Sequence, residues 1–342
     1  MLTTDSVNEI SETDTGILGV YHLKRFWWCV LSKINNYQPA SAKALYESHL
    51  DYLVINALGL NFEQTVRFLN QTTPRFEEFE QWIIDITCGV DDIQVALINA
   101  AISGTDYPED IKKHITYIEN HEPVLSKEDI EFWNKQGYVV LHNAVSLQNC
   151  CLAVEAIFNH LDANLEHPDS WYKNWDRGIM LQFYQHLALK ANRESSTIHK
   201  AFSQLWGTAD LWASTDNCAF NIPERHGWLF SGPDLHWDIC LKSPIPFGTR
   251  AILYLTDTTP EQGAFTCIPG FHHQIDEWIS SLPAGADPCK QILHNPGSKT
   301  IEGKAGDLII WHHALPYGFT PNRGLKPMIA QYINFYPAII NK

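Results

Sequence analysis

The chain has 342 residues, of which 45% are hydrophobic and 18% charged, a composition typical of a folded protein with one large core or two domains. Its formal net charge of -15 argues against a nucleic-acid partner, because phosphate binding requires basic patches. The eight cysteines show no CxxC spacing, and neither an apolar leader nor a long uncharged apolar run is visible. The sequence therefore predicts a cytoplasmic protein with reduced thiols, neither secreted nor bound to a membrane.

Residues 1–120 are predicted to form a helical N-terminal region. Hydrophobic residues recur at spacings of three and four in segments 46–60, 62–70, 76–86 and 91–102, and glycines or prolines separate these segments. In the first segment Leu50, Leu53, Val54 and Ala57 form such a stripe. The region contains no recognisable metal or nucleophile motif, so we expect it to act as a scaffold.

Residues 121–342 are predicted to form a second domain of mixed α+β type. Ser126 and Asp129 form a capping box before a helix over 130–135, and a helix over 146–165 follows a short strand over 138–141. A segment over 178–182 is predicted as a strand lining a pocket, with Gln182 as its polar candidate. Short β-type runs then follow at 217–220, 235–241, 249–256, 263–268, 307–313 and 329–335. Many short strands without long helices between them indicate an antiparallel sandwich or barrel.

The triplet His236-Trp237-Asp238 is the main candidate for chemistry. On a strand, residues i and i+2 project from the same face, so the imidazole and the carboxylate can reach one metal ion while Trp237 points into the core. Two histidines and one carboxylate are the usual ligands of non-haem Fe(II) oxygenases. A second copy of this spacing, His167-Pro168-Asp169, contains proline and is predicted to lie in a structural turn.

Several motifs follow this triplet in a fixed order. They are Glu261-Gln262-Gly263-Ala264-Phe265, Pro269-Gly270-Phe271-His272-His273, Gly306-Asp307 before an apolar run, and Pro316-Tyr317-Gly318 followed by Pro321-Asn322. This series, over residues 125–337, resembles the phytanoyl-CoA dioxygenase family of Fe(II)- and 2-oxoglutarate-dependent oxygenases. The resemblance implies a double-stranded β-helix, a jelly-roll barrel with iron at its mouth, in which His236 and Asp238 are two of the ligands.

The last motif departs from the family pattern at two positions. The resemblance implies a histidine before Gly318 as the third iron ligand, and an arginine about ten residues later that pairs with the distal carboxylate of 2-oxoglutarate. Aligning Gly318 and Asn322 puts Tyr317 at the histidine position and Met328 at the arginine position. A neutral phenol is a weak ligand for Fe(II), and a thioether cannot pair with a carboxylate.

Other residues can compensate for these two changes. His313 lies four residues before Tyr317, on the same strand face, and is an alternative third metal ligand, although a core or pocket-wall role for His312 and His313 is also open. Arg250 and Lys326 are alternative anchors for an anionic co-substrate, together with Gln182 as a polar contact. His272 and His273 are expected at the barrel rim.

Two functions from different classes remain open. The first is an Fe(II) oxygenase of the 2-oxoglutarate type that uses O2 to oxidise a small molecule, with His236, Asp238 and either His313 or Tyr317 as ligands. The second is a family-derived protein without 2-oxoglutarate turnover, acting as a binding or regulatory module or in a non-redox step. A third, weaker hypothesis is a jelly-roll metal enzyme of another chemistry.

Overall fold

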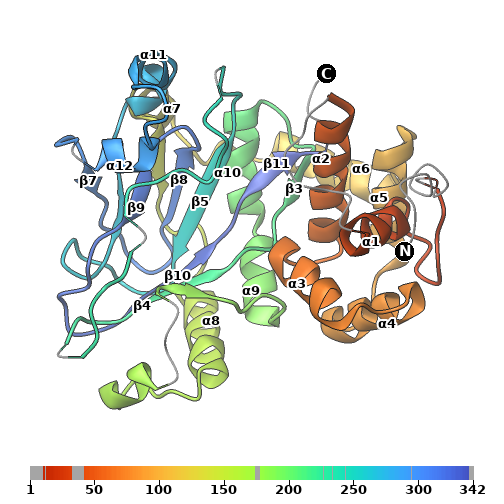
Figure 1. The fold of residues 1–342 in the computed structure, drawn as a ribbon, viewed down its shortest axis with the longest axis horizontal. Helices are drawn as coiled ribbons and strands as arrows, with labels where there is room; N and C mark the ends of the chain where they lie inside the picture. The colour runs from red at the N-terminus through yellow and green to blue at the C-terminus, as the bar shows by residue number, and fades with distance from the viewer. Residues whose placement is uncertain are drawn as a thin grey trace. The chain divides into compact units, whose positions relative to one another are not determined.

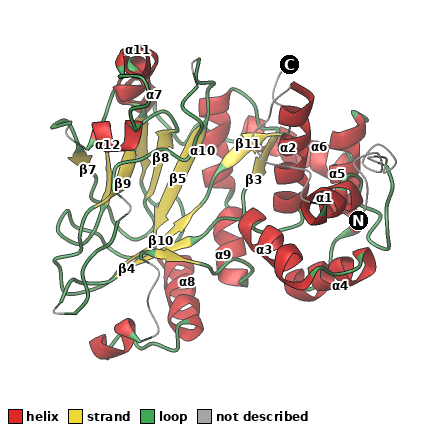
Figure 2. Cartoon of the chain, in the orientation of Figure 1, coloured by secondary structure: helices red, strands yellow, loops and turns green. Residues whose placement is uncertain are grey.

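The computed structural model describes residues 11, 13–32, 42–173, 178–225, 227–232, 234–242, 244–293 and 295–338. The chain divides into two compact units (Figure 1). The first comprises Met1–Asn120, Thr208–Thr215 and Pro337–Lys342, and the second comprises His121–Gly207 and Asp216–Tyr336. In Figure 2 the first unit is mainly helical, whereas the second combines helices with strands.

Helices make up most of the first unit. They are α1 (Leu23–Leu31), α2 (Ala42–Ala57), α3 (Phe62–Thr72), α4 (Phe76–Thr87), α5 (Asp92–Ser103) and α6 (Glu109–Asn120), with the short strand β3 (Leu211–Ala213). The sequence patterns predict α2 to α5 but neither α1 nor α6. Asn61 and Asp91 cap α3 and α5, because their side chains accept hydrogen bonds from the first-turn amides of Gln64 and Ile93.

Aromatic and aliphatic side chains form the core of the first unit. The ring of Phe26 packs against Phe62 and Phe79, with ring centroids 5.8 Å and 6.4 Å apart. Leu53 and Val54 from the predicted stripe are fully buried. This packing supports the expected scaffold role of the helices.

The larger sheet of the second unit is antiparallel and has the strand order β1-β8-β5-β10-β4-β2. Its strands are β1 (Tyr138–Leu141), β2 (Met180–Leu181), β4 (Cys218–Asn221), β5 (Thr249–Tyr254), β8 (Leu308–His312) and β10 (Met328–Tyr332). The order is far from the chain order, so neighbouring strands come from distant parts of the sequence. Each of these strands lies within or beside a segment predicted from the sequence.

A smaller antiparallel sheet has the order β7-β6-β9 and completes the barrel architecture. Its strands are β6 (Phe265–Cys267), β7 (Lys299–Thr300) and β9 (Tyr317–Phe319). The unit also contains α7 (Lys127–Gln136), α8 (Leu147–His160), η2 (Pro168–Tyr172), α9 (Leu187–Arg193), α10 (Ser196–Trp206), η3 (Phe271–His273), α11 (Ile275–Ser281), α12 (Pro288–Ile292) and β11 (Phe335–Pro337). Helices α9 and α10 are absent from the sequence prediction. The predicted class, an α+β jelly-roll barrel with N-terminal helices, is confirmed.

Side chains alternate between the two faces of the larger sheet. On β5, Ile252 and Tyr254 belong to the hydrophobic cluster that also contains Phe265 of β6 and Tyr317 of β9, so this face is the inside of the barrel. On the opposite face, Gln331 of β10 accepts a hydrogen bond from Asn192 of α9. Every second residue along a strand of this sheet therefore faces the inside of the barrel.

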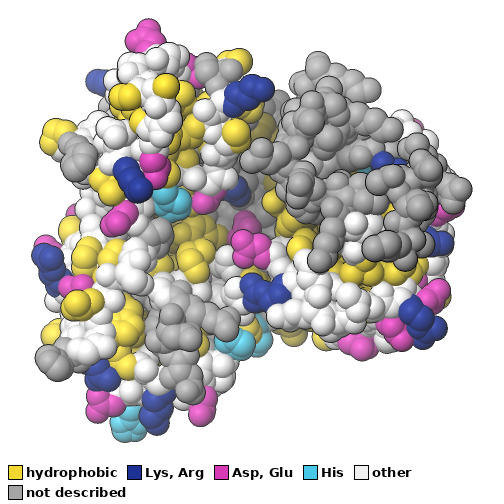
Figure 3. Space-filling view, viewed as in Figure 1, with side chains coloured by type: hydrophobic (Ala, Val, Ile, Leu, Met, Phe, Trp, Pro, Cys, Tyr) yellow, Lys and Arg dark blue, Asp and Glu magenta, His cyan; other side chains and the backbone are white. Residues whose placement is uncertain are grey.

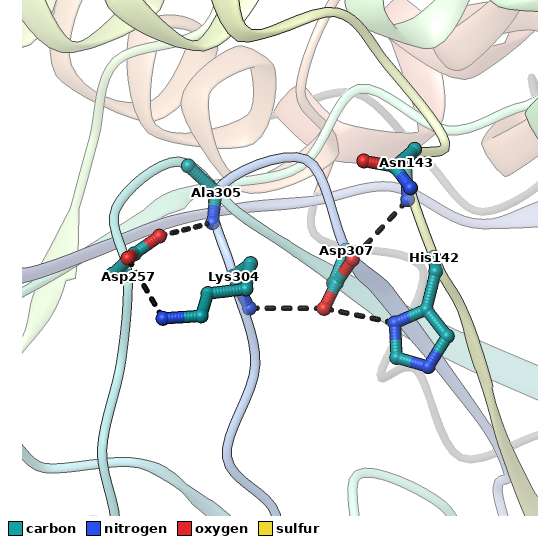
Figure 4. A network of polar contacts seen from close by, with 6 residues as sticks. All are labelled: His142, Asn143, Asp257, Lys304, Ala305 and Asp307. Atoms are coloured by element: carbon teal, nitrogen blue, oxygen red, sulfur yellow. Dashed lines mark hydrogen bonds and ion pairs between the residues drawn. The ribbon is translucent and has the colours of Figure 1, made fainter.

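The turn before β8 is held by a buried carboxylate (Figure 4). Asp307 is 3% exposed and accepts hydrogen bonds from the backbone amides of Asn143 and Lys304 and from the ring of His142. Gly306 has a φ of +94°, and a Cβ there would lie 2.8 Å from the Val145 carbonyl oxygen. The Gly306-Asp307 motif thus has a structural role, namely to join β1 to β8.

Two general expectations from the sequence can be compared with the structure. All eight cysteines are free thiols. Within the described residues, no helix is both long and apolar enough to span a bilayer.

Candidate active site at the mouth of the barrel

The expected strand over 235–241 is wrong in detail. The segment is irregular except at His236, which forms an isolated antiparallel bridge with Tyr317 of β9. The His236 amide donates to the Tyr317 carbonyl at 2.9 Å, and the Tyr317 amide donates to the His236 carbonyl at 3.0 Å. This pairing fixes the His236 ring next to the Tyr317 ring, with centroids 4.6 Å apart.

His236 and Asp238 nevertheless come together as the sequence pattern predicts. His236 Nε2 lies 3.4 Å from Asp238 Oδ1, and the two side chains are 26% and 44% exposed. His236 Nδ1 lies 2.7 Å from the Asp234 carbonyl oxygen, and because a carbonyl can only accept, Nδ1 carries the hydrogen. Nε2 is therefore the ring nitrogen that faces Asp238.

Tyr317 completes this group from the neighbouring strand. Its side chain is buried, and its hydroxyl donates a short hydrogen bond to Asp238 Oδ2. The two oxygens of Asp238 thus face two different partners, His236 and Tyr317. One nitrogen and one phenol oxygen thus flank the Asp238 carboxylate.

Electrostatics at this point favour an ionised Asp238 and a neutral Tyr317. Burial alone raises the pKa of Asp238, but hydrogen bonds from His236 and Tyr317 and the charge of Arg250 outweigh it and lower the pKa to about 2. Burial, followed by the proximity of Tyr332 and Asp238, holds the pKa of Tyr317 well above its ordinary value. Burial lowers the pKa of His236, but hydrogen bonds to Asp238 and to the Asp234 carbonyl, together with the charge of Asp238, more than reverse this.

Trp237 belongs to the hydrophobic core, as predicted. It is 7% exposed, its indole Nε1 donates to the Ala314 carbonyl at 2.9 Å, and its ring packs against Phe271 and Trp278. This packing anchors the triplet to the barrel core. The packing of Trp237 and the backbone bridge to Tyr317 therefore both hold His236 and Asp238 in place.

His313 is not brought to the site. Its ring Nε2 lies 2.6 Å from the Pro246 carbonyl oxygen, and its amide donates to the Gly248 carbonyl. Among the described residues, no three His, Cys, Asp or Glu side chains are grouped so that they could hold a metal ion. The alternative of His313 as a ligand beside His236 and Asp238 is thus not supported by the geometry.

The residues considered as anchors for an anion differ in burial and in their place in the fold. Lys326 is exposed in the turn before β10, where its carbonyl accepts from Asn322. Met328 is fully buried at the start of β10 and belongs to the cluster inside the barrel. Gln182 is half-buried at a tight turn directly after β2. Arg250 is half-buried on β5, and its positive charge favours the ionised forms of Asp238 and Tyr317, although burial outweighs it at Tyr317.

Two residues at this end of the barrel are missed by the sequence patterns. Tyr332 of β10 and Asn217, which precedes β4, are neighbours, because the Tyr332 amide donates to the Asn217 carbonyl at 3.1 Å. Tyr332 lies two residues after Ala330, an inner-face residue of β10. The alternation along β10 is the signal that could have identified it.

The four histidines expected at the rim or in the pocket wall form a cluster outside the candidate site. The rings of His272 and His273 are 3.9 Å apart, those of His272 and His312 are 5.2 Å apart, and those of His312 and His313 are 5.4 Å apart. His273 also contacts the Asn134 carbonyl of α7. The cluster packs next to α7 and β8.

Comparison with known proteins decides the family. Residues 133–329 match the phytanoyl-CoA dioxygenase (PhyH) family. The chain belongs to the phytanoyl-CoA dioxygenase family. A Dictyostelium discoideum protein named "Putative phytanoyl-CoA dioxygenase" is 21% identical over 264 residues, which cover 60% of this chain and 74% of that protein.

Two solved structures are similar to this chain over 64% of its length. A non-haem α-ketoglutarate-dependent carbocyclase, SnoK, from nogalamycin biosynthesis is 18% identical, with a TM-score of 0.47 over 64% of this chain and 85% of SnoK. EctD from S. alaskensis with bound Fe is 16% identical, with a TM-score of 0.46 over 64% of this chain and 79% of EctD. Family membership assigns the chain to the non-haem Fe(II)- and 2-oxoglutarate-dependent oxygenases, which oxidise small molecules with O2.

His236 and Asp238 are suitable as two iron ligands, and Tyr317 offers a phenol as a third. The donation from His236 Nδ1 to a backbone carbonyl is the second-shell contact typical of metal-binding histidines, and it directs Nε2 toward Asp238. Tyr317 can serve as a ligand only after losing its proton, which a bound cation favours. Met328 does not fit the carboxylate of 2-oxoglutarate, because it is apolar and buried.

The face of the second unit drawn in Figure 3 has a mixed character. On the face of the second unit that Figure 3 shows, acidic and basic side chains are interspersed, and hydrophobic side chains lie between them.

Proposed function

We propose that this chain oxidises a small molecule at a mononuclear iron site that His236 and Asp238 hold, with the Tyr317 oxygen as third protein donor. The observation that carries the proposal is the 3.4 Å approach of His236 Nε2 to Asp238 Oδ1 beside the Tyr317 hydroxyl. Iron and an oxidisable co-substrate supply the activation of O2. The eight free thiols favour a cytoplasmic location.

The protein's part is to hold and orient. Packing of Trp237 against Phe271 and Trp278 fixes the position of His236 and Asp238 on the core, and the Asp234 carbonyl fixes the His236 tautomer. The side chains of His236 and Asp238 keep contact with solvent, so a small molecule can approach them. Preorganisation of this kind is what a metal site requires of its protein.

A second function, binding or a non-redox step without 2-oxoglutarate turnover, is favoured by one observation. Met328, which we propose replaces the family's arginine, lies fully buried among the apolar residues inside the barrel. A dicarboxylate anchored there would be buried without a partner, which is costly. If 2-oxoglutarate is used, its anchor must therefore lie elsewhere.

Substitution of Asp238 tests the iron site. Asp238→Ala removes one donor, and we expect Fe(II) affinity to fall by at least about tenfold and O2-dependent succinate formation from 2-oxoglutarate to be lost. The matched control is Asp169→Ala, in the other triplet of the same spacing, where Asp169 is exposed and pairs with Arg225. Anaerobic titration with Fe(II) and then 2-oxoglutarate, followed by the visible charge-transfer band, measures both steps.

The possible outcomes separate the two functions. The oxygenase is supported if the wild type and Asp169→Ala bind iron, show the charge-transfer band and form succinate, whereas Asp238→Ala loses the band and succinate formation. Iron binding without the band and without succinate favours the second function. Equal iron affinity of the two variants and the wild type contradicts the proposed site.

A further inference from the structure

The inner face of the larger sheet carries polar side chains at the end nearest His236 and Asp238. Arg250 lies two residues before Ile252 on β5, and Tyr332 lies two residues after Ala330 on β10, so both share the face that lines the barrel. Gln331 of β10 lies opposite Cys218 of β4, and Asn217 pairs with Tyr332 one residue further along. Three adjacent strands thus present an amide, a phenol and a guanidinium.

This set, which we name the mouth row (Asn217, Tyr332 and Arg250), faces the candidate iron ligands. Arg250 is directly opposite Trp311 of β8, and the Trp311 ring lies 4.7 Å from the Tyr317 ring. The positive charge of Arg250 acts on Asp238, Tyr317 and Tyr332, and also on His313. A molecule bound to the mouth row therefore lies beside the oxidation site.

Asn217 has an acceptor that lacks a hydrogen-bond partner. Its Oδ1 is buried and makes no hydrogen bond, although the residue itself is half-buried. A buried acceptor without a donor is unfavourable, and few native acceptors are left in this state. A ligand with a hydroxyl or amino group is a suitable donor for it.

Resting on the proposed function, we propose that the mouth row binds a small organic acid whose carboxylate pairs with Arg250 and whose hydroxyl or amino group donates to Asn217. Arg is suited to this task because its planar guanidinium forms paired hydrogen bonds to a carboxylate. Tyr332 lies on the strand between β4 and β5, and its hydroxyl is a further donor to the acid. The substrate class is thus a hydroxy or amino acid, and the same cation can also take the carboxylate of 2-oxoglutarate.

Calorimetric titration of the metal-free protein tests the mouth row apart from the iron site. The probes are 2-hydroxyglutarate, which has a carboxylate and a donor hydroxyl, and 2-oxoglutarate, which has carboxylates and no donor. We expect Arg250→Gln to weaken both probes by at least about tenfold. We expect Asn217→Ala to weaken 2-hydroxyglutarate by about fivefold and to leave 2-oxoglutarate unchanged.

Two further variants keep the test decisive. Lys290→Gln removes a unit of positive charge from an 81%-exposed side chain of α12, and its affinities should equal those of the wild type. Arg250→Lys keeps the charge but loses the paired geometry, so a smaller weakening, of about threefold to tenfold, is expected. It replaces Arg250→Gln if that variant does not fold, as judged by circular dichroism.

Each result has a clear reading. Loss of both probes in Arg250→Gln, with selective loss of 2-hydroxyglutarate in Asn217→Ala, supports the proposal. Absence of binding to the wild type, or equal binding to Arg250→Gln, overturns it. If Arg250→Gln weakens binding of both probes but Asn217→Ala has no effect, the hydroxy- or amino-acid class is overturned. Arg250 is then assigned to 2-oxoglutarate. Because no metal is present, a failure of the iron proposal leaves these readings valid.

Discussion

The phenol of Tyr317 decides the chemistry of the site at the scale of single residues. It is buried, it donates to Asp238 Oδ2, and its pKa is held above the ordinary value, first by burial. A neutral phenol hydrogen-bonded to one carboxylate oxygen competes with a metal for that oxygen. Tyr317 therefore weakens the iron site as long as it keeps its proton.

Replacing Tyr317 by histidine should strengthen iron binding. Tyr317→His supplies an imidazole and removes the competing donation to Asp238, so we expect Fe(II) affinity to rise by at least about tenfold, since even outer-shell partners change metal affinity by roughly 10- to 100-fold. Anaerobic competition with a chelator of known affinity measures this change.

Tyr317→Phe is the matched variant, because it removes only the hydroxyl. If Tyr317 binds the metal, Phe weakens iron binding and abolishes the visible absorption of a tyrosinate–Fe(III) pair after oxidation. If the hydroxyl only competes for Asp238, Phe strengthens iron binding. Unchanged affinity in both variants would contradict any role of Tyr317 at the metal.

Elements differ in how far the sequence predicts them. The apolar runs of β5, β8 and β10 are visible in the sequence because these strands are buried on both faces. The segment around His236 is not a regular strand, because its backbone pairs with β9 only at Tyr317. Local patterns therefore identified His236 and Asp238 through their spacing, but not the hydrogen bond that joins Asp238 to Tyr317.

The turn before β8 gives a prediction at the same scale. Asp307→Ala leaves the amides of Asn143 and Lys304 without their acceptor (Figure 4), so we expect a loss of about 2–4 kcal/mol in the free energy of unfolding. Asp257 in the same network has a side chain that is 64% exposed and accepts from Lys304 Nζ and the Ala305 amide, so Asp257→Ala should cost less than about 1 kcal/mol.

Urea unfolding followed by tryptophan fluorescence compares these two variants with the wild type. Similar losses of unfolding free energy in both variants would contradict the larger contribution that we assign to the buried Asp307. Fe(II) binding to the folded variants serves as a check that the barrel is intact.

At the scale of the whole molecule, closure of the barrel joins segments that are distant in sequence. Tyr138 of β1 lies opposite Trp311 of β8, and Met328 of β10 lies opposite Asn221 of β4. Hydrophobic periodicity identifies strands but contains no record of these partners. The partners of Asn217 and Arg250, and hence the mouth row, could be found only from the strand register.

The histidine cluster makes the stability of the folded chain sensitive to acid. Burial, followed by the neighbouring histidines, lowers the pKa of His312 to about 3 and that of His272 to about 4. Below their ordinary pKa of 6.5, the unfolded chain binds protons that the folded chain does not, so stability falls as pH is lowered from 6.5 toward these values. Above pH 6.5 both states are neutral here, and the cluster adds no pH dependence.

We therefore expect the urea midpoint of the wild type to fall steadily between pH 6.5 and pH 4. His312→Gln removes one titrating group and should make this fall shallower, whereas His167→Gln, at an exposed position, should leave it unchanged. Equal slopes for all three proteins would mean that His312 is protonated in the folded chain, which would contradict its burial among His272, His273 and His313. The comparison isolates the cluster because acidic groups such as Asp238 titrate equally in all three proteins.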